Sequence, residues 1–244
     1  EGKNILENVS FTVKPGESIA LVGPTGAGKT TIVNLLSRFY DLTGGAVYID
    51  GNDISKVTLH SLREKMGIMM QDSFIFSGTI EDNIRYGKLD ATEEEIRAAA
   101  KTVCADEFIM GLENGYKTEM YEGGSQLSGG QRQRISIARA LACEPEILIC
   151  DEAVSALDVS VQADILKLLE EIQVKLGIGI LFVTHDLRVA SQICDDVIVI
   201  RRGECVESGH VQDVFFHPQH EYTKSLIAAA PGTNYPFGRT AHLF

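Results

Sequence analysis

The segment at residues 23–30, which reads GPTGAGKT, narrows the possible folds of this chain more than any other feature. It matches the pattern G-x-x-x-x-G-K-[ST], follows a predicted strand at residues 18–22 and opens a predicted helix at residues 30–39. Glycines let the backbone curl so that its N–H groups point at phosphate oxygens, and the helix N-terminus adds positive potential. The segment therefore predicts a strand, a phosphate-binding loop and a helix; a glycine-rich turn with a surface lysine is the alternative.

Side chains at the end of this loop add contacts that the backbone cannot make. Lys29 is predicted to reach the β and γ phosphates of a nucleotide, and Thr30 to place its hydroxyl on Mg²⁺. The residues predicted to bind nucleotide here are Gly23, Pro24, Thr25, Gly26, Ala27, Gly28, Lys29, Thr30 and Thr31.

Apolar β-rich runs alternate with helical patterns along most of the chain. Helices are predicted at residues 153–176 and 187–193, with two short ones at 212–216 and 223–230. The predicted strands lie at residues 46–49, 67–70, 147–151, 180–184 and 197–200. This alternation predicts an α/β fold with a mostly parallel, doubly wound sheet, and we expect the first two of these strands to belong to one sheet.

Two segments depart from the alternation. Residues 9–13 and 18–22 flank the turn Lys14-Pro15-Gly16-Glu17 and predict an antiparallel hairpin. From residue 79 to about residue 120, helix formers replace β-branched residues, which predicts a helical insertion. We therefore divide the chain into a nucleotide-binding core in two parts (residues 1–78 and 127–230), a helical subdomain (79–126) and a C-terminal tail (231–244).

Composition excludes several classes of function. The chain has 22 Lys and Arg against 34 Asp and Glu, and its net charge of −12 argues against broad binding to nucleic acid or anionic lipid. Its longest apolar runs fall far short of the roughly 18 to 20 residues that span a bilayer, and no secretion signal is visible, so we expect a cytoplasmic protein. The five cysteines lack metal-ligand spacing, so we expect them to pack in the core.

Two acids end the apolar run at residues 147–150. Asp151 and Glu152 should therefore lie at the carboxyl edge of the sheet, where ligands of such folds bind. Asp151 suits Mg²⁺, and Glu152 could polarise a water for attack on the γ-phosphate. Taken alone, the run fits an ordinary strand end equally well, and the phosphate loop favours the functional interpretation.

A second glycine-containing segment, Leu127-Ser128-Gly129-Gly130-Gln131, precedes a helical pattern at residues 135–141. It predicts a backbone nest at a helix N-terminus, which is a second place to bind phosphate. A serine and two glycines before a helix are also a good cap, and without context the cap is the stronger interpretation.

Together these segments, with Ser155-Ala156-Leu157-Asp158 and Thr184-His185-Asp186, resemble the nucleotide-binding domain of ABC transporters, whose signature is the pentapeptide at residues 127–131. The resemblance covers roughly residues 3–231. It implies a P-loop NTPase with a RecA-like sheet, an N-terminal antiparallel β subdomain and a helical insertion. It also implies an ATPase that binds ATP and Mg²⁺ and works with a membrane-spanning transporter domain or subunit at the cytoplasmic face of the membrane.

The resemblance also implies residue roles. The chain would form a head-to-tail homodimer, or pair with another ATPase subunit, so that the phosphate loop of one subunit faces Ser128 and Gly130 of the other. Gln71 matches the glutamine that contacts Mg²⁺ and the attacking water, and His185 would hydrogen-bond the γ-phosphate. The catalytic residues implied are Glu152, His185, Gln71 and Lys29, the Mg²⁺ ligands Thr30, Gln71 and Asp151, and the further ATP contacts Ser128, Gly129, Gly130, Gln131 and Asp158.

Two features depart from a typical member. The aromatic residue on which members stack adenine would precede the first residues of this chain, so we expect weaker adenine binding, unless Phe11 substitutes for it; a core role for Phe11 is the favoured alternative. Residues 4–141 resemble exporters, whereas residues from about 144 onward resemble the ATPase subunits of oligopeptide and dipeptide importers. A chimera is therefore expected, with a divergent single lineage as its alternative.

Three other functions were weighed against a transport ATPase. A soluble ABC protein of repair or translation would carry coiled-coil insertions or two tandem cassettes, which this chain lacks. The segment at residues 127–131 argues against a different phosphate-loop enzyme, such as a small-molecule kinase or a GTPase, and a guanine-reading N-K-x-D motif is also absent. A chimeric scaffold that binds nucleotide without driving transport stays open at this point.

Overall fold

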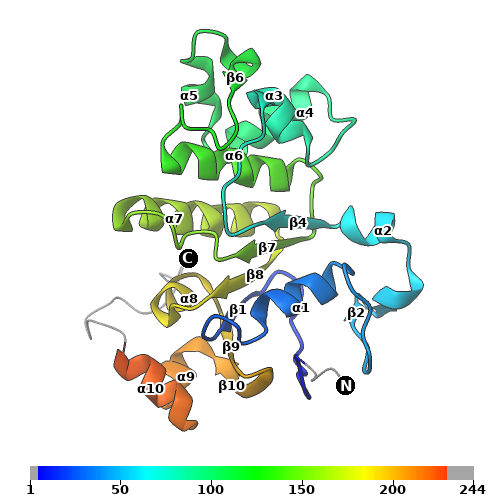
Figure 1. Cartoon of the computed structure of the whole chain (residues 1–244), viewed down its shortest axis with the longest axis vertical. Helices are drawn as coiled ribbons and strands as arrows, with labels where there is room; N and C mark the ends of the chain where they lie inside the picture. Colours follow the sequence, from blue (N-terminus) through cyan, green and yellow to red (C-terminus); the bar gives the residue numbers. More distant parts are fainter. Residues whose placement is uncertain (1–4, 230–244) are drawn as a thin grey trace. The chain divides into compact units, whose positions relative to one another are not determined.

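The computed structural model describes residues 5–229 of the chain (Figure 1). The backbone divides into two compact units, one formed by Glu1–Leu62 with Gly179–Phe244 and the other by Arg63–Ile178. The prediction for the tail at residues 231–244 lies outside the described residues.

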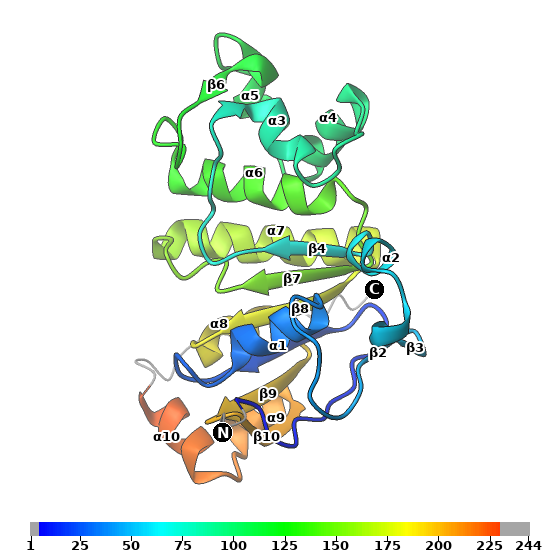
Figure 2. The same ribbon diagram turned by 45° about the vertical axis from the view of Figure 1, so that its right-hand side comes forward.

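The first unit is built on four strands. Strand β1 (Ser18–Val22) lies between β8 (Gly179–Thr184) and β9 (Asp196–Arg201) and is parallel to both (Figure 1). Figure 2 shows β8 and β9 from a second direction. Strand β10 (Glu204–His210) runs antiparallel to β9. All five residues of β1 are buried, as expected for a strand with a neighbour on each edge and helices on its faces.

The remaining elements of this unit are short. Helix α1 (Lys29–Leu36) follows β1, and helix α8 (Leu187–Ile193) packs on β1 and β8. Strands β2 (Tyr48–Ile49) and β3 (Asn52–Asp53) form a separate antiparallel pair. The other helical segments here are the 3₁₀ helix η1 (Ile54–Lys56), α2 (Leu59–Arg63) at the boundary, α9 (Val211–Phe216) and α10 (Glu221–Ala229).

The second unit combines a parallel strand pair with a group of helices. Strand β4 (Met66–Met69) is parallel to β7 (Ile147–Asp151), and α6 (Gly129–Leu141) packs on β4. The small helices α3 (Ile80–Arg85) and α4 (Glu93–Thr102) pack on α6. The unit also contains α5 (Asp106–Met110), the 3₁₀ helix η2 (Gly115–Lys117), the long helix α7 (Val159–Leu176) and the strand pair β5 (Gly78–Thr79) and β6 (Glu119–Met120).

Capping residues set where these helices begin. Thr79, Thr92 and Ser128 each accept a hydrogen bond from the backbone N–H three residues later, and the side chain at that later position bonds back to the cap. Helix α7 begins after Asp158, whose carboxylate accepts from the N–H of Val161, and ends at Gly177 in the left-handed region.

Two glycines allow the backbone to approach helix α6 closely. A Cβ atom on Gly87 would lie 1.8 Å from the carbonyl oxygen of Arg139, and one on Gly67 would lie 2.5 Å from that of Ala140. A side chain at either place would force the helix away, so glycine is required by packing.

The fold class is confirmed, since the pairs β1–β8, β1–β9 and β4–β7 are all parallel and β9–β10 is antiparallel. The helices predicted within residues 79–120 are also present. No helix in the range 5–229 is both long and apolar enough to cross a membrane.

Three details of the predicted strands are wrong, and the expectation that all five cysteines pack in the core is wrong for Cys104, which is exposed. Residues 9–13 form no strand, because β8 and β9 already occupy the two edges of β1 and leave no edge for a hairpin partner. Residues 46–49 and 67–70 do not share a sheet, since β2 pairs with β3 whereas β4 pairs with β7. Strand β10 was not predicted at all.

Candidate active site

The loop between β1 and α1 has the backbone that its glycines predict. Gly26 and Gly28 have φ angles of 78° and 106°, which side-chain-bearing residues rarely adopt, and Gly28 immediately precedes the first turn of α1. The N–H groups at a helix start have no partners within the helix and are available to an anion. The residues of the loop tip, Pro24, Thr25 and Gly26, are exposed, whereas Ala27 and Gly28 are buried.

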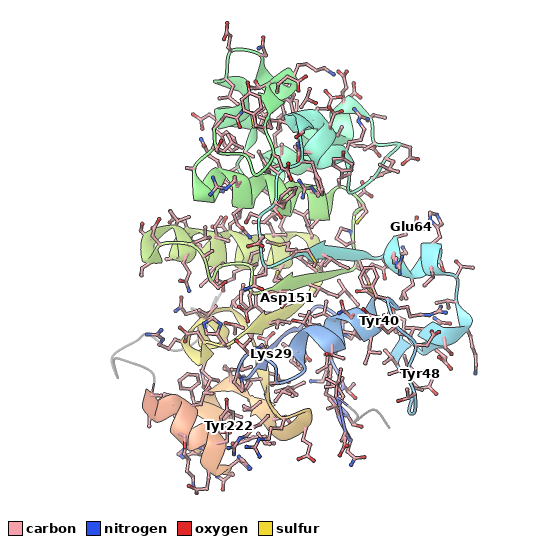
Figure 3. All side chains as sticks on the ribbon, in the orientation of Figure 1. Lys29, Tyr40, Tyr48, Glu64, Asp151 and Tyr222 are labelled. Atoms are coloured by element: carbon pink, nitrogen blue, oxygen red, sulfur yellow. The ribbon has the colours of Figure 1, made fainter. Side chains whose placement is uncertain are left out.

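Lys29, labelled in Figure 3, folds back onto carbonyl oxygens of this loop. Its side chain is 5% exposed, and its Nζ donates to the carbonyl oxygens of Gly23, at 2.7 Å, and Pro24, at 3.1 Å. These bonds hold the ammonium group beside the loop. Thr30 is exposed and Thr31 half-buried, so the hydroxyl of Thr30 is accessible next to the loop.

His185 follows strand β8 in the same unit and is exposed. The next residue, Asp186, caps α8 by accepting from the backbone N–H of Arg188 at 2.8 Å, and its carboxylate also accepts from Arg188 Nε at 2.9 Å. Burial by itself raises the pKa of Asp186, but the hydrogen bonds and charge of Arg188 outweigh it and hold the pKa below its usual value. The segment that carries His185 is thus fixed by an ion pair that the sequence analysis did not identify.

The second unit contains the two acids. Asp151, labelled in Figure 3, ends β7. It is 5% exposed. Glu152 comes next with a φ of 49°, and its carbonyl oxygen accepts from the N–H and the hydroxyl of Ser155, at 3.1 and 2.9 Å. Because of this turn, the two consecutive acids differ in exposure: Asp151 is buried and Glu152 is half-buried.

Gln71 meets Glu152 at this strand edge. The Nε2 atom of Gln71 donates to Oε2 of Glu152 at 3.3 Å, although 81 positions separate them. The contact follows from topology, because β4 and β7 are parallel neighbours and residues just past their carboxyl ends share one edge. The structure therefore brings together two of the residues predicted to be catalytic.

Ser128 and Asp158 both cap helices. Ser128 Oγ accepts from the N–H of Gln131 at 3.2 Å, while Gln131 Oε1 accepts from the N–H of Ser128 at 2.9 Å. The capping role weighed above is thus real, and because the hydroxyl acts as an acceptor it keeps its proton to donate. Asp158 accepts from Val161 N and Ser160 Oγ, and the hydrogen bond from Val161 is the main reason that its pKa is lowered.

Other contacts of this unit were missed by sequence reasoning. Arg139, near the end of α6, donates to Asn83 O, Asn83 Oδ1 and Phe74 O, at 2.7, 2.9 and 3.0 Å. Ser73 Oγ contacts Gln133 Oε1 on the same helix. Such contacts join segments about 60 positions apart, and no local pattern at either position indicates them.

Comparison with known proteins identifies the family. A family model described as "ABC transporter" matches residues 6–155. The chain belongs to the ABC transporter family. It is 47% identical over 213 residues, 86% of the chain, to an ABC transporter ATP-binding protein, YfiC, of Bacillus subtilis. It is 46% identical over 213 residues, 87% of the chain, to the ATP-dependent lipid A-core flippase of Desulfotalea psychrophila.

Comparison with solved structures agrees with this family assignment. The fold resembles that of a bacterial Atm1-family ABC exporter with ATP bound, with a TM-score of 0.82 and 40% identity over 93% of this chain and 39% of that one. The chain spans about a third of the length of the two curated relatives, 34% and 36%. It is therefore similar to one part of these larger proteins.

The comparisons do not support a chimera with an importer-like rear half. Matches to the flippase and to YfiC extend over 86–87% of the chain as single relatives, and the exporter structure covers 93%. Since residues 144–229 make up more than a third of the chain, coverage this high extends well beyond the supposed seam. Local motifs in the rear half were overinterpreted.

Proposed function

We propose that this chain is the ATP-binding and ATP-hydrolysing part of an ABC exporter. The observation that carries the proposal is the phosphate loop, with two glycines at positive φ, Lys29 folded onto its carbonyls and a helix starting directly behind it. The family match and the likeness to an ATP-bound exporter agree with this assignment.

The loop would hold the phosphates of ATP, with Lys29 exchanging its bonds to the carbonyl oxygens for bonds to phosphate. Thr30, Gln71 and Asp151 offer hydroxyl, amide and carboxylate oxygens, a set of donors that Mg²⁺ prefers. Bound there, Mg²⁺ would offset negative charge on the β and γ phosphates. How strongly adenine is held, and whether Phe11 contributes, stays a prediction; Phe11 is half-buried.

Hydrolysis would rest on Glu152. A carboxylate can orient a water and accept its proton, and Gln71, which already contacts Glu152 Oε2, is placed to position the same water. His185 would donate a hydrogen bond to the γ-phosphate. Because phosphoryl transfer depends on positioning and charge neutralisation, loss of one of these groups should slow hydrolysis far more than it weakens ATP binding.

Two copies would assemble head to tail around two ATP molecules. Ser128, Gly129, Gly130 and Gln131 at the start of α6 would meet the phosphates bound by the opposite subunit, and Asp158 would line the interface. The retained hydroxyl proton of Ser128 and the helix N-terminus both suit that anion. A different ATPase subunit could replace the second copy and supply the opposite half of each ATP site.

A membrane-spanning exporter domain would dock on an exposed aromatic cluster, formed by Phe74, Phe76 and Tyr86. These side chains are 39%, 40% and 52% exposed, and their rings lie in series with centroids 5.1 and 4.7 Å apart. Exposed aromatic side chains in contact with one another are typical of binding surfaces. We accordingly propose a location at the cytoplasmic face of a membrane, with residues 79–126 acting as a helical subdomain that contributes Tyr86 to this cluster.

The test is steady-state Mg·ATP hydrolysis measured as a function of protein concentration, with Glu152→Gln as the blank. Specific activity that rises with concentration and disappears in the variant would support composite sites formed by two chains. A protein that binds ATP but shows no activity above the blank at any concentration would contradict the proposal.

A further inference from the structure

The second unit contains a cavity that is lined by Gln71 and Gly129 of the proposed ATP site and otherwise by residues without a proposed role in catalysis. Its volume is about 230 Å³, and its walls come from three segments, residues 71–74, residues 123–133 and residues 153–157. This volume is below the roughly 300–1,000 Å³ of pockets that hold drug-sized ligands, so an occupant would have few non-hydrogen atoms.

A buried side chain in its wall has an unused donor. Gln133 is 1% exposed, and its Oε1 is taken by Ser73, but its Nε2 has no hydrogen-bond partner among the described residues. Leaving a buried donor unpaired is costly, and such groups in native proteins call for an explanation. An acceptor atom in the cavity would supply the missing partner.

Arg132 adds positive charge to the same wall. It is half-buried, and both hydrogen bonds that its side chain makes within residues 5–229, to the carbonyl oxygens of Leu127 and Gly124, start from Nη1. A guanidinium has five N–H donors in a planar fork that matches a carboxylate. Asp72 also lines the cavity, but its side chain is exposed, so water screens its charge.

The cavity also has an apolar part. Phe74 comes from one segment, and Ala156 and Leu157 come from another. An amide donor and a guanidinium beside an aromatic ring and aliphatic carbons complement a molecule with one anionic end and one apolar end. We propose that the cavity binds a small monocarboxylate with a compact branched apolar group.

An occupant would touch the residue that links this site to hydrolysis. Gln71 lines the cavity and contacts Glu152 Oε2 at 3.3 Å. If the proposed ATPase function holds, the carboxylate would therefore also change the hydrolysis rate. Binding itself does not depend on that function and is measured separately.

The experiment is isothermal titration calorimetry of the whole chain, without nucleotide, using 4-methylpentanoate and the uncharged 4-methyl-1-pentanol as probes. Gln133→Leu keeps the volume of the side chain and removes the donor, and should weaken binding of the acid about 10- to 100-fold. Ala156→Phe fills the cavity from an exposed position, where folding tolerates the change, and should abolish binding. Gln173→Leu, at a buried glutamine of α7 outside the cavity, is the matched control and should bind normally.

Three outcomes would overturn the proposal. The wild-type chain could show no binding of the acid at millimolar concentrations, or the alcohol could bind as tightly as the acid. Unchanged binding in Ala156→Phe would place the acid elsewhere, and this test remains decisive if Gln133→Leu does not fold.

Discussion

Replacing Arg139 with leucine should lower the free energy of unfolding by about 2–3 kcal/mol. The guanidinium makes three hydrogen bonds, to Asn83 O, Asn83 Oδ1 and Phe74 O, and its Cζ lies 5.0 Å from the centroid of the Phe76 ring. Bonds from a charged donor contribute about 1.5 kcal/mol each, which gives about 4–5 kcal/mol.

Part of this contribution is offset by desolvation. Burial lowers the pKa of Arg139 to about 10, because the charged form is less well solvated in the protein than in water. The leucine variant escapes that penalty but removes the Arg139 donor from both oxygens of Asn83, which is fully buried; Asn83 Oδ1 keeps its bond from the backbone N–H of Phe76, at 2.9 Å. The net loss is therefore smaller than the three bonds suggest.

Urea denaturation followed by circular dichroism measures the effect. Arg134→Leu is the matched control, because Arg134 lies on the same helix and donates to one carbonyl oxygen, that of Val103, at 2.7 Å. Its expected loss is about 1.5 kcal/mol, the contribution of one bond from a charged donor. Equal losses in the two variants would refute the reasoning that Arg139 holds the segment from Phe74 to Asn83 on α6.

Four further outcomes are expected. Lys29→Ala should abolish hydrolysis and weaken ATP binding, and full activity would contradict the site. Glu152→Gln should trap an ATP-bound dimer, visible by size-exclusion chromatography with Mg·ATP; a monomer at saturating ATP would contradict the shared site. Gly87→Ala should cost about 1–3 kcal/mol in urea denaturation, because its Cβ would lie 1.8 Å from a backbone oxygen, whereas Gly111→Ala, 3.4 Å from its nearest neighbour, should be nearly neutral. Asp186→Asn should weaken the fall in the free energy of unfolding at acid pH. The folded pKa of Asp186 is lowered from 3.8, so its carboxylate stabilises the fold above pH 3.8, and this stabilisation is lost as the pH falls through the folded pKa.

The parts of the site that lie on one continuous segment could be predicted from the sequence. The phosphate loop needs only a strand, glycines and a helix start in succession, and its geometry agrees with the pattern. The contact between Gln71 and Glu152 could not be derived in this way, because it depends on β4 and β7 being parallel neighbours. Only the family resemblance connected these two residues.

Strand pairing also explains an error in the predicted fold. The β-rich composition of residues 9–13 was typical of a strand, but a strand needs a free edge to pair with, and both edges of β1 are occupied. Strand β10 was missed because its residues are only partly buried and carry no strong apolar pattern. The feature near β10 that is typical of a hairpin is the turn at Arg202-Gly203. Both φ angles are positive there, at 52° and 85°, as in a tight two-residue hairpin turn.

Helix α6 links three features that were inferred separately. Ser128 caps its N-terminus, Gln133 faces the cavity one turn later, and Arg139 holds the aromatic cluster near its C-terminus. Eleven residues of helix span about 16 Å, and a hydrogen-bonded helix transmits a shift along its axis with little compression. A partner that moved Phe74 and Phe76 would therefore move Arg139, and with it the helix whose first turn carries Ser128. The same partner would also act on the cavity, because Phe74 lines it, so docking at the aromatic cluster and carboxylate binding should each alter the affinity for the other.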